Sequence, residues 1–314
     1  MKKLCFSLPL FALFVMASVT AHAETKIGVT VSLFDDMWLT TLRDGMQRYA
    51  DKLGDVKLIF EDARSDVSTQ QNQVQNFIVS KVDGILVAPV VDPSSGPVIS
   101  KAAKEAGIPL VFVNNAPVNV DSLPDGQAFV GSDDLEAGTL QAQAVCKLLG
   151  GKGQVLLMLG QLGTTGQRFR TQGVHDVFKR DECKGMKILE EQTANYMRVP
   201  AIDLMNNWMT AGFKFDAVIA NNDEMALGAA QALKASGVPM DKVVVAGVDG
   251  TRDALTAMKA GNLDITIFQN GPGQGRLAID VLLKLIKREP VDKKNFVPFE
   301  LVTKENLDKY LEAK

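Results

Sequence analysis

Short apolar runs alternate with longer amphipathic segments along almost the whole chain. Several of the short runs, such as Gly84-Ile85-Leu86-Val87-Ala88, are apolar at every position. A strand that is apolar on both faces is typical of the middle of a parallel sheet, where helices cover both faces. The pattern predicts ten strands, at Lys26–Ser32, Val56–Glu61, Gly84–Pro89, Leu110–Asn114, Ala128–Gly131, Gln154–Leu159, Lys187–Gln192, Ala217–Ala220, Val243–Val248 and Ile265–Gln269.

The segments between these strands have the periodicity of helices, with apolar residues three and four positions apart. One such face consists of Leu39, Leu42, Met46 and Tyr49. A second consists of Ala226, Ala229, Ala230 and Leu233. Gly107 and Gly237 each precede a Val/Ile-Pro pair and predict helix ends. The alternation predicts an α/β protein, and ten strands over this length fit two sheets better than one. No Pro- or Ser-rich linker separates the halves, which favours several chain crossings and a hinge.

The first 23 residues predict a secretory signal peptide. Lys2 and Lys3 precede an apolar run from Leu4 to Val19, and Ala21-His22-Ala23 forms a small-x-small exit before Glu24. The run is short for a membrane anchor, although an uncleaved anchor is the alternative. We therefore expect an exported mature chain that begins at Glu24.

Composition limits the chemistry of the mature chain. Without Lys2 and Lys3, 32 basic residues face 37 acidic ones, a net charge of about −5 that gives no reason to bind nucleic acid. His175 is its one histidine, so a zinc site or a Ser-His-Asp triad is hard to build, and we expect no metal and no cofactor. Cys146 and Cys183 are the only mature cysteines; an exported chain predicts a disulfide between them, with two free thiols as the alternative.

Polar side chains follow many of the predicted strands. In open α/β sheets ligands bind beyond the carboxyl ends of the strands. Carboxylates, amides and an aromatic face suit a ligand rich in hydroxyl groups. The polar residues at these ends are Ser32, Asp35, Asp36 and Trp38; Asn114 and Asn115; Gln161 to Arg170; Asn195 and Tyr196; Asn221, Asn222 and Asp223; Asp249; and Gln269 and Asn270.

Four ordered motifs resemble the periplasmic ribose/galactose-type sugar-binding proteins, the solute receptors of bacterial ABC importers. The resemblance runs from Thr25 to about Leu301, and the turn Phe34-Asp-Asp-Met-Trp38 with the Asn114-Asn115 pair resembles the inositol/rhizopine-binding branch most. The motifs are Ile27-Gly-Val-Thr-Val-Ser32, Val82-Asp-Gly-Ile-Leu-Val-Ala-Pro89, Asn222-Asp-Glu-Met-Ala-Leu-Gly228 and Gly247-Val-Asp-Gly-Thr251.

This resemblance implies the fold, partners and location of the protein. The fold is that of type I periplasmic binding proteins: two Rossmann-like lobes, each a mostly parallel sheet flanked by helices, joined by a multi-crossing hinge. The lobes are expected at 24–132 plus 270–298 and at 133–269 plus 299–314. The implied partners are a small polyol and the membrane subunits of an ABC permease, with no nucleic acid. The protein is expected to be a periplasmic monomer.

The resemblance also implies the binding residues, position by position. Asn114 and Asn115 stand where ribose-type receptors carry an Asp-Arg pair, which argues against ribose without arguing against polyols. A six-membered polyol, with myo-inositol favoured, is the expected ligand. The expected ligand-binding residues are Ser32, Asp36, Trp38, Asn114, Asn115, Arg170, Tyr196, Asn222, Asp249 and Gln269.

Some of these residues have simpler structural roles open to them. Trp38 could be core, and Asp249 could cap a helix. Of the Asn222-Asp223 pair, we expect Asp223 to cap the following helix and Asn222 to bind. Arg168 is expected to face solvent, unlike Arg170. The glycine run at 160, 163 and 166 is a weak phosphate-loop signal, because it lacks the Gly-Lys-Ser/Thr ending.

The sequence is compatible with three classes of function. A non-catalytic receptor that closes around a polyol is favoured. Another sugar such as ribose or galactose is the alternative ligand, and a chemoreceptor a second partner. A sugar-responsive repressor would need a basic DNA-binding headpiece where this chain has its leader. An exported glycosidase could use Asp36 and Asp249 as paired carboxylates, although nothing in the sequence indicates a raised pKa.

Overall fold

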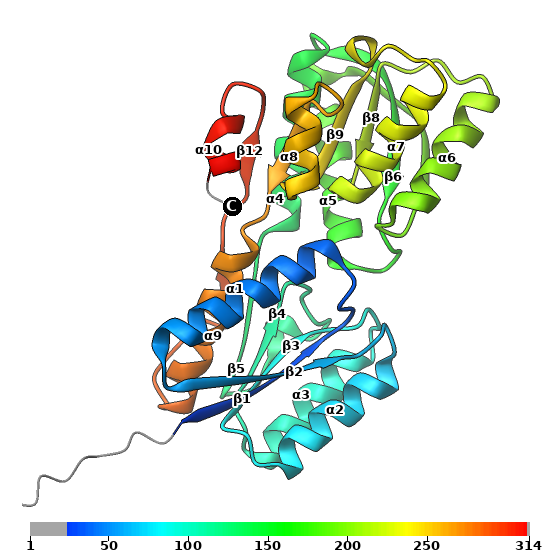
Figure 1. The fold of residues 1–314 in the computed structure, drawn as a ribbon. Coiled ribbons are helices and arrows are strands. Elements are labelled where there is room, and N and C mark those ends of the chain that lie inside the picture. The colour runs from blue at the N-terminus through cyan, green and yellow to red at the C-terminus, as the bar shows by residue number, and fades with distance from the viewer. Residues whose placement is uncertain (1–23, 313–314) are drawn as a thin grey trace, which may run out of the picture.

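The computed structural model describes residues 24–312. The predicted signal peptide, residues 1–23, therefore lies outside the described residues. The described chain forms two lobes, each built around its own six-stranded sheet, and Figure 1 shows them one above the other. The prediction of two mostly parallel sheets flanked by helices is confirmed.

The sheet of the first lobe is entirely parallel. Its order is β11-β5-β4-β3-β1-β2, and each neighbouring pair is parallel. The central strands β3 and β4 are buried at every position, as their apolar sequences require. The strands are β1 (Thr25–Val31), β2 (Val56–Asp62), β3 (Gly84–Ala88), β4 (Leu110–Val113), β5 (Gln127–Gly131) and β11 (Lys294–Phe296).

The sheet of the second lobe has one antiparallel edge. Its order is β12-β10-β9-β8-β6-β7, and β12 runs antiparallel to β10 while the other pairs are parallel. The strands are β6 (Lys152–Leu159), β7 (Gly185–Thr193), β8 (Ala217–Ala220), β9 (Val244–Asp249), β10 (Ile265–Phe268) and β12 (Glu300–Val302).

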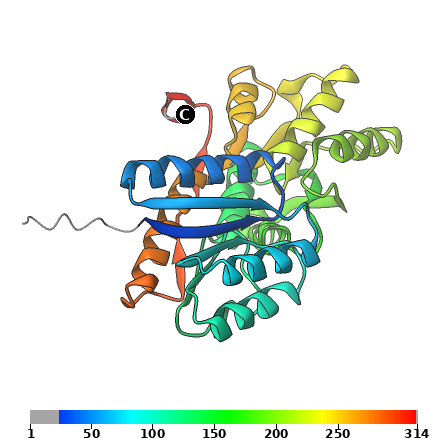
Figure 2. The same cartoon turned by 60° about the horizontal axis from the view of Figure 1, so that its bottom comes forward.

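Helices cover both faces of each sheet. In the first lobe α1 and α9 pack on one face and α2 and α3 on the other, as Figure 2 shows. In the second lobe α4 and α5 cover one face and α6, α7 and α8 the other, while α10 packs against α8. The helices are α1 (Met37–Leu53), α2 (Val67–Val79), α3 (Ser95–Ala106), α4 (Asp134–Leu148), α5 (Thr165–Phe178), α6 (Arg198–Thr210), α7 (Asp223–Ala235), α8 (Arg252–Lys259), α9 (Gly271–Ile286) and α10 (Leu307–Glu312).

Helix α1 shows how local sequence sets an element that carries site residues. Asp36 precedes it, and its Oδ1 accepts a hydrogen bond from the Leu39 N–H at 2.8 Å, the interaction of an N-cap. Gly54 ends the helix with φ 78°, a left-handed conformation that glycine adopts at little cost. Leu42 and Met46, from the predicted apolar face, are buried.

All ten predicted strands are present, and two further strands were not predicted. β11 and β12 have three residues each and lie at the edges of the two sheets. Both follow α9, so they extend each sheet with residues from the end of the chain. The lobe boundaries given above stay a prediction.

The described chain crosses between the lobes at three places: between β5 and α4, between β10 and α9, and between β11 and β12. One hydroxyl connects them. Ser132, in the first crossing, donates to the carbonyl of Val297 in the third at 2.6 Å. It accepts from Nε2 of Gln274, in the first turn of α9 after the second crossing, at 2.8 Å. Ser132 and Gln274 are both buried, so the crossings are bonded together at their centre.

A disulfide joins Cys146 to Cys183, and the predicted pairing is confirmed. Cys146 lies in the last turns of α4, and Cys183 ends a short 3₁₀ turn before β7. Both residues are buried in the core between α4, α5 and their sheet. The bond therefore fastens the start of β7 to the helix beside it.

Candidate ligand-binding site between the lobes

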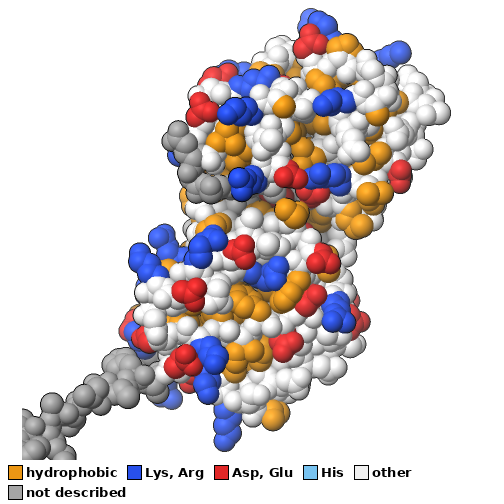
Figure 3. Space-filling model, in the orientation of Figure 1, with side chains coloured by type: hydrophobic (Ala, Val, Ile, Leu, Met, Phe, Trp, Pro, Cys, Tyr) orange, Lys and Arg blue, Asp and Glu red, His pale blue; other side chains and the backbone are white. Residues whose placement is uncertain are grey.

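Residues that follow strands in both lobes meet at the waist between them. Figure 3 shows this waist as a constriction between two larger masses. The expected site residues lie as follows: Ser32 after β1, Asp36 and Trp38 at the start of α1, Asn114 and Asn115 after β4, Arg170 in α5, Tyr196 between β7 and α6, Asn222 before α7, Asp249 at the end of β9, and Gln269 in the second crossing.

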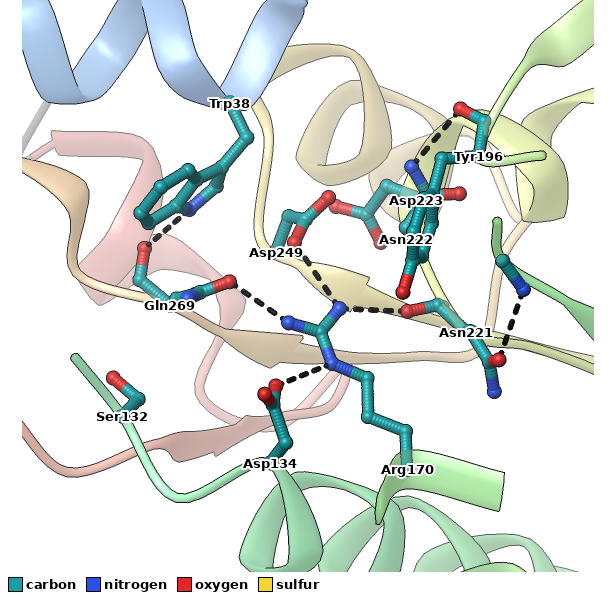
Figure 4. A network of polar contacts seen from close by, with 12 residues as sticks. Trp38, Ser132, Asp134, Arg170, Tyr196, Asn221, Asn222, Asp223, Asp249 and Gln269 are labelled. Carbon is teal, nitrogen blue, oxygen red and sulfur yellow. Dashed lines mark hydrogen bonds and ion pairs between the residues drawn. The ribbon is translucent and has the colours of Figure 1, made fainter. Parts of the chain in front are cut away.

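Arg170 is the centre of the network drawn in Figure 4. Its Nε donates to Oδ1 of Asp134 at 2.9 Å, its Nη1 to the carbonyl of Asn221 at 2.7 Å, and its Nη2 to Oε1 of Gln269 at 3.1 Å. The side chain is 6% exposed. Burial lowers the pKa of Arg170, but the carboxylates of Asp134 and Asp249 raise it by more, so the net shift is upward and the guanidinium keeps its charge. Arg168, two positions earlier, is exposed as predicted.

Asp249 is buried beside Arg170 without a short bond to it. Its Oδ1 lies 3.7 Å from Nη1 of Arg170. Burial raises the pKa of Asp249 well above its ordinary value, and the nearby carboxylates of Asp223, Asp36 and Glu224 add to this effect, whereas Arg170 opposes it. The backbone φ of Asp249 is 126°, a conformation that only glycine adopts without strain. Strain of this kind clusters at functional sites.

Tyr196 lines the network from the second lobe. Its hydroxyl is 2.9 Å from Oγ1 of Thr164, and burial raises its pKa. Its φ of 62° is also in the left-handed region. A Cβ added to Gly160 would lie 2.0 Å from Cζ of the tyrosine ring, and one added to Gly166 would lie 2.8 Å from its hydroxyl. Two glycines of the phosphate-loop-like run, Gly160 and Gly166, therefore make room for Tyr196.

The expected roles of Asn222 and Asp223 were wrong in part. Asn222 is the N-cap of α7, because its Oδ1 accepts from the N–H of Met225 at 3.1 Å. Asp223 does not cap: its carboxylate accepts from the N–H of Thr251 and from Oγ1 of Thr266, both at 2.7 Å. Asn222 still faces the site, since its Nδ2 donates to the carbonyl of Tyr196 at 3.2 Å.

Asp249 is not a helix cap either. The N-cap of α8 is Thr251, whose Oγ1 accepts from the N–H of Ala254 at 3.2 Å. The simpler role considered for Asp249 in the sequence is therefore wrong, and its carboxylate is left to face Arg170.

Trp38 and Asp36 extend the site into the first lobe. Nε1 of Trp38 donates to the carbonyl of Gln269 at 3.2 Å. The indole is 7% exposed and packs into the core under α1, so only a small part of it can face a ligand. Asp36 caps α1 and is partly exposed, yet burial raises its pKa and the carboxylate of Glu224 in the other lobe raises it further.

Ser32 follows β1, and the asparagine pair follows β4 in the same sheet. All three are half-buried, and Asn114 has a left-handed φ of 69°. Asn115 lines a cavity of about 390 Å³ between the lobes, together with Ser132, Asp134 and Thr164.

Asp134, Asn221 and Thr164 take part in the network but lie outside the expected ligand-binding set. Asp134 is in the first turn of a helix, where acidic residues are common, so its residue type gave no signal of a site. Asn221 contributes through its backbone carbonyl, which no residue type reveals. Thr164 is the N-cap of α5 and contacts Tyr196 through the same hydroxyl. Asn221 and the stretch 161–170 that contains Thr164 both follow predicted strands, and that position was the available signal.

Two further observations limit what the site can be. Across residues 24–312 no group of three or more His, Cys, Asp or Glu side chains is placed to hold a metal ion. None of the helices in that range combines the length and apolar character needed to cross a membrane.

Two α/β lobes that meet around buried charges and amides are typical of solute-binding proteins. The chain is 54% identical over 296 residues to a protein of Rhizobium meliloti named as a rhizopine-binding protein, which covers 94% of this chain and 95% of that one. It is 38% identical to the xylitol-binding protein of Mycolicibacterium smegmatis, and the match covers 93% of this chain and 81% of that protein. A solved ABC transporter solute-binding protein from Bacillus halodurans with bound myo-inositol is 40% identical, with a TM-score of 0.86 over 94% of this chain and 100% of that one.

Residues 27–290 match the family model of the periplasmic binding protein domain. The chain belongs to this family, and the resemblance seen in its sequence motifs is confirmed. Members of the family are solute-binding receptors.

Proposed function

We propose that this protein is the periplasmic receptor of an ABC importer and that it captures myo-inositol, or a closely similar cyclitol or monosaccharide, between its lobes. The observation that carries the proposal is the convergence of Trp38, Arg170, Asp249 and Gln269 at the waist. The relative that binds myo-inositol and the relative named for rhizopine support a cyclitol as ligand.

The site offers the groups that a ring of hydroxyls requires. Asp249 provides charged acceptors from the second lobe, and Asn222 provides an amide that can donate and accept. Ser32, Asp36 and the two asparagines after β4 would contact hydroxyls from the first lobe. Trp38 would cover an apolar face of the ring with its exposed edge. About eight hydrogen bonds, each contributing about 1 kcal/mol net and more where one partner is charged, would supply micromolar affinity, about −8 kcal/mol.

Closure of the lobes follows from where the ligand would bind. A ligand stabilises the closed form only if it contacts both lobes in that form, because its differential affinity shifts the population. The lobes, 24–132 with 270–298 and 133–269 with 299–314, would turn about the three crossings. The closed form is then the species that a membrane permease recognises.

The remaining parts of the proposal concern location and activity. Export with removal of residues 1–23 would place the protein in the periplasm. There we expect it to be a monomer. We expect no catalysis, because a receptor that closes over its ligand obstructs turnover. Purified protein incubated with aryl glycosides should release nothing above the buffer blank.

Calorimetric titration of the mature protein tests the ligand. Myo-inositol, ribose, glucose and galactose are compared at equal concentration, and myo-inositol should bind most tightly. One inverted hydroxyl leaves buried polar groups unpaired, so epimers should be rejected. Tight binding of ribose with none of myo-inositol would refute the cyclitol assignment, and silence from all four would refute the sugar receptor.

A further inference from the structure

Asp134 lies outside the set of residues expected to bind a ligand, yet it makes the shortest contact between a carboxylate and Arg170. It is the first residue of α4, directly after the first crossing. Its side chain is 11% exposed, and its Oδ1 accepts from Nε of Arg170 at 2.9 Å. The corresponding distance from Arg170 to Asp249 is 3.7 Å. Of these two carboxylates, Asp134 therefore binds the guanidinium in the described structure.

Three segments hold the guanidinium from three sides. Asp134, on α4, accepts a hydrogen bond from Nε of Arg170. The carbonyl of Asn221, after β8, accepts one from Nη1, and Gln269, in the second crossing, accepts one from Nη2. A guanidinium is a planar, rigid fork, so three anchors on its three nitrogens fix both its position and its orientation. Figure 4 shows the three bonds spread around the group.

The packing of α4 on α5 brings Asp134 and Arg170 within reach of one another. A Cβ added to Gly138, four residues after Asp134 on α4, would lie 2.0 Å from the carbonyl oxygen of Arg170. One added to Gly173 of α5 would lie 2.6 Å from the N–H nitrogen of Thr139. Residues four apart share a face of a helix. The face of α4 that carries Asp134 is therefore in direct backbone contact with α5.

We propose that Asp134 is a positioning residue, which holds Arg170 so that the carboxylate of Asp249 stays available to the ligand. Without Asp134, Asp249 is the remaining carboxylate beside the guanidinium, and a direct pair between them would occupy the acceptors that ligand hydroxyls need. The inference rests on the proposed function, since it assigns Asp134 a role in that same site.

A double-mutant cycle measured by calorimetry with myo-inositol tests this role. Asp134→Asn, which keeps the shape of the side chain, should weaken binding about tenfold or more. In an Arg170→Gln background the same change should have less than about a twofold effect, because the partner through which Asp134 acts is gone. Asp134 also lines the cavity between the lobes, and equal losses in both backgrounds would mean that it contacts the ligand itself and would overturn the inference.

Asp133→Asn is the matched control. Asp133 is exposed, is the N-cap of α4, and accepts from the N–H of Leu135 at 3.0 Å. Asp133 lines the same cavity as Asp134 but bonds Leu135 rather than Arg170. Its loss therefore weakens the helix start and removes a carboxylate from the cavity while Arg170 stays held, so the affinity should be unchanged. A loss equal to that of Asp134→Asn would assign the effect to the helix and overturn the inference.

A second measurement needs no ligand. The Nε–H proton of Arg170, followed by ¹H–¹⁵N NMR, should exchange slowly in the wild type and in Asp133→Asn, and rapidly in Asp134→Asn. Slow exchange in Asp134→Asn would overturn the inference even if no polyol bound. If the wild type binds none of the four polyols while this exchange pattern holds, the proposed ligand is refuted and the positioning of Arg170 by Asp134 stands.

Discussion

Nη1 of Arg170 and Oδ1 of Asp249 are 3.7 Å apart, although both side chains are almost completely buried. At this separation they attract one another without a hydrogen bond. Arg170 is bonded elsewhere, to Asp134, Asn221 and Gln269. Asp249 thus keeps a charged acceptor that Arg170 does not use, and this makes it the strongest candidate for a ligand hydroxyl.

Asp249→Ala should abolish the thermal stabilisation that myo-inositol provides, while the ligand-free protein stays folded. The ligand loses a charged acceptor, a cost of about 1.5–3 kcal/mol or 10- to 150-fold in affinity. Asp249→Gly is the matched control, because glycine adopts the φ of 126° without strain. The glycine variant should bind as weakly as the alanine variant but unfold at a higher temperature. Wild-type affinity in either variant would give Asp249 a purely structural role.

The pH dependence of stability should reveal the buried Asp249 carboxyl. Its folded-state pKa is raised above the ordinary value of 3.8. Its contribution to the stability of the ligand-free protein is therefore fully present below about pH 4 and is lost as the pH rises through the folded pKa. Stabilisation by the ligand should grow over the same range, because the ligand needs the ionised form. The difference between wild type and Asp249→Asn in thermal unfolding, from about pH 4 to 7, isolates this group; no pH dependence in that difference would contradict the assignment.

Most of the fold could be predicted because strands that are apolar at every position leave little choice. Gly84–Ala88 is buried at all five positions, as its apolar sequence predicts for a strand in the middle of a parallel sheet. β11 and β12 were missed because three residues are too few to show a period of two, and Lys294 and Glu300 are charged residues of the kind that edge strands tolerate.

The site was less predictable, because neighbouring residues of similar chemistry can exchange roles. Asn222 and Asp223 both carry an oxygen suited to capping α7, and tertiary contacts decide between them. The carboxylate of Asp223 accepts hydrogen bonds from Thr251 and Thr266. Asn222 therefore provides the N-cap of α7. Such contacts join residues far apart in the sequence, which a local pattern cannot show.

Ser132→Ala should loosen the three crossings. The variant leaves the carbonyl of Val297 and Nε2 of Gln274 without their buried partner, at a cost of about 1–3 kcal/mol in the free energy of unfolding. Urea unfolding measures this loss, and small-angle scattering of the ligand-free protein should report a changed radius of gyration. Ser122→Ala is the control: Ser122 is exposed and bonds only the nearby carbonyl of Asn119, so its effect should stay within about 0.5 kcal/mol. Equal stabilities of the two variants would contradict a role for Ser132 in the hinge.

Removal of the disulfide should lower stability without affecting binding. Cys146 and Cys183 are separated by 37 positions, and a loop of this length predicts that Cys146→Ser/Cys183→Ser loses roughly 2–4 kcal/mol. Affinity for myo-inositol should not change, because Cys146 lies at the opposite end of α4 from Asp134. Thiol titration of the denatured, unreduced wild type should find no free sulfhydryl in the mature chain, and two free thiols would refute the bond.

The position of α9 and β11 has a consequence for the order in which the lobes fold. Residues 24–131 form most of the first lobe, but its core also needs Ile279 and Leu282 of α9, and its sheet needs Lys294–Phe296. The second lobe draws on one nearly continuous segment, 134–268, and can assemble earlier. A chain made from its N-terminus therefore holds its first lobe incomplete until the last tenth of the sequence has been synthesised. Such a delay would suit the export proposed above, in which the chain passes through a membrane before it folds.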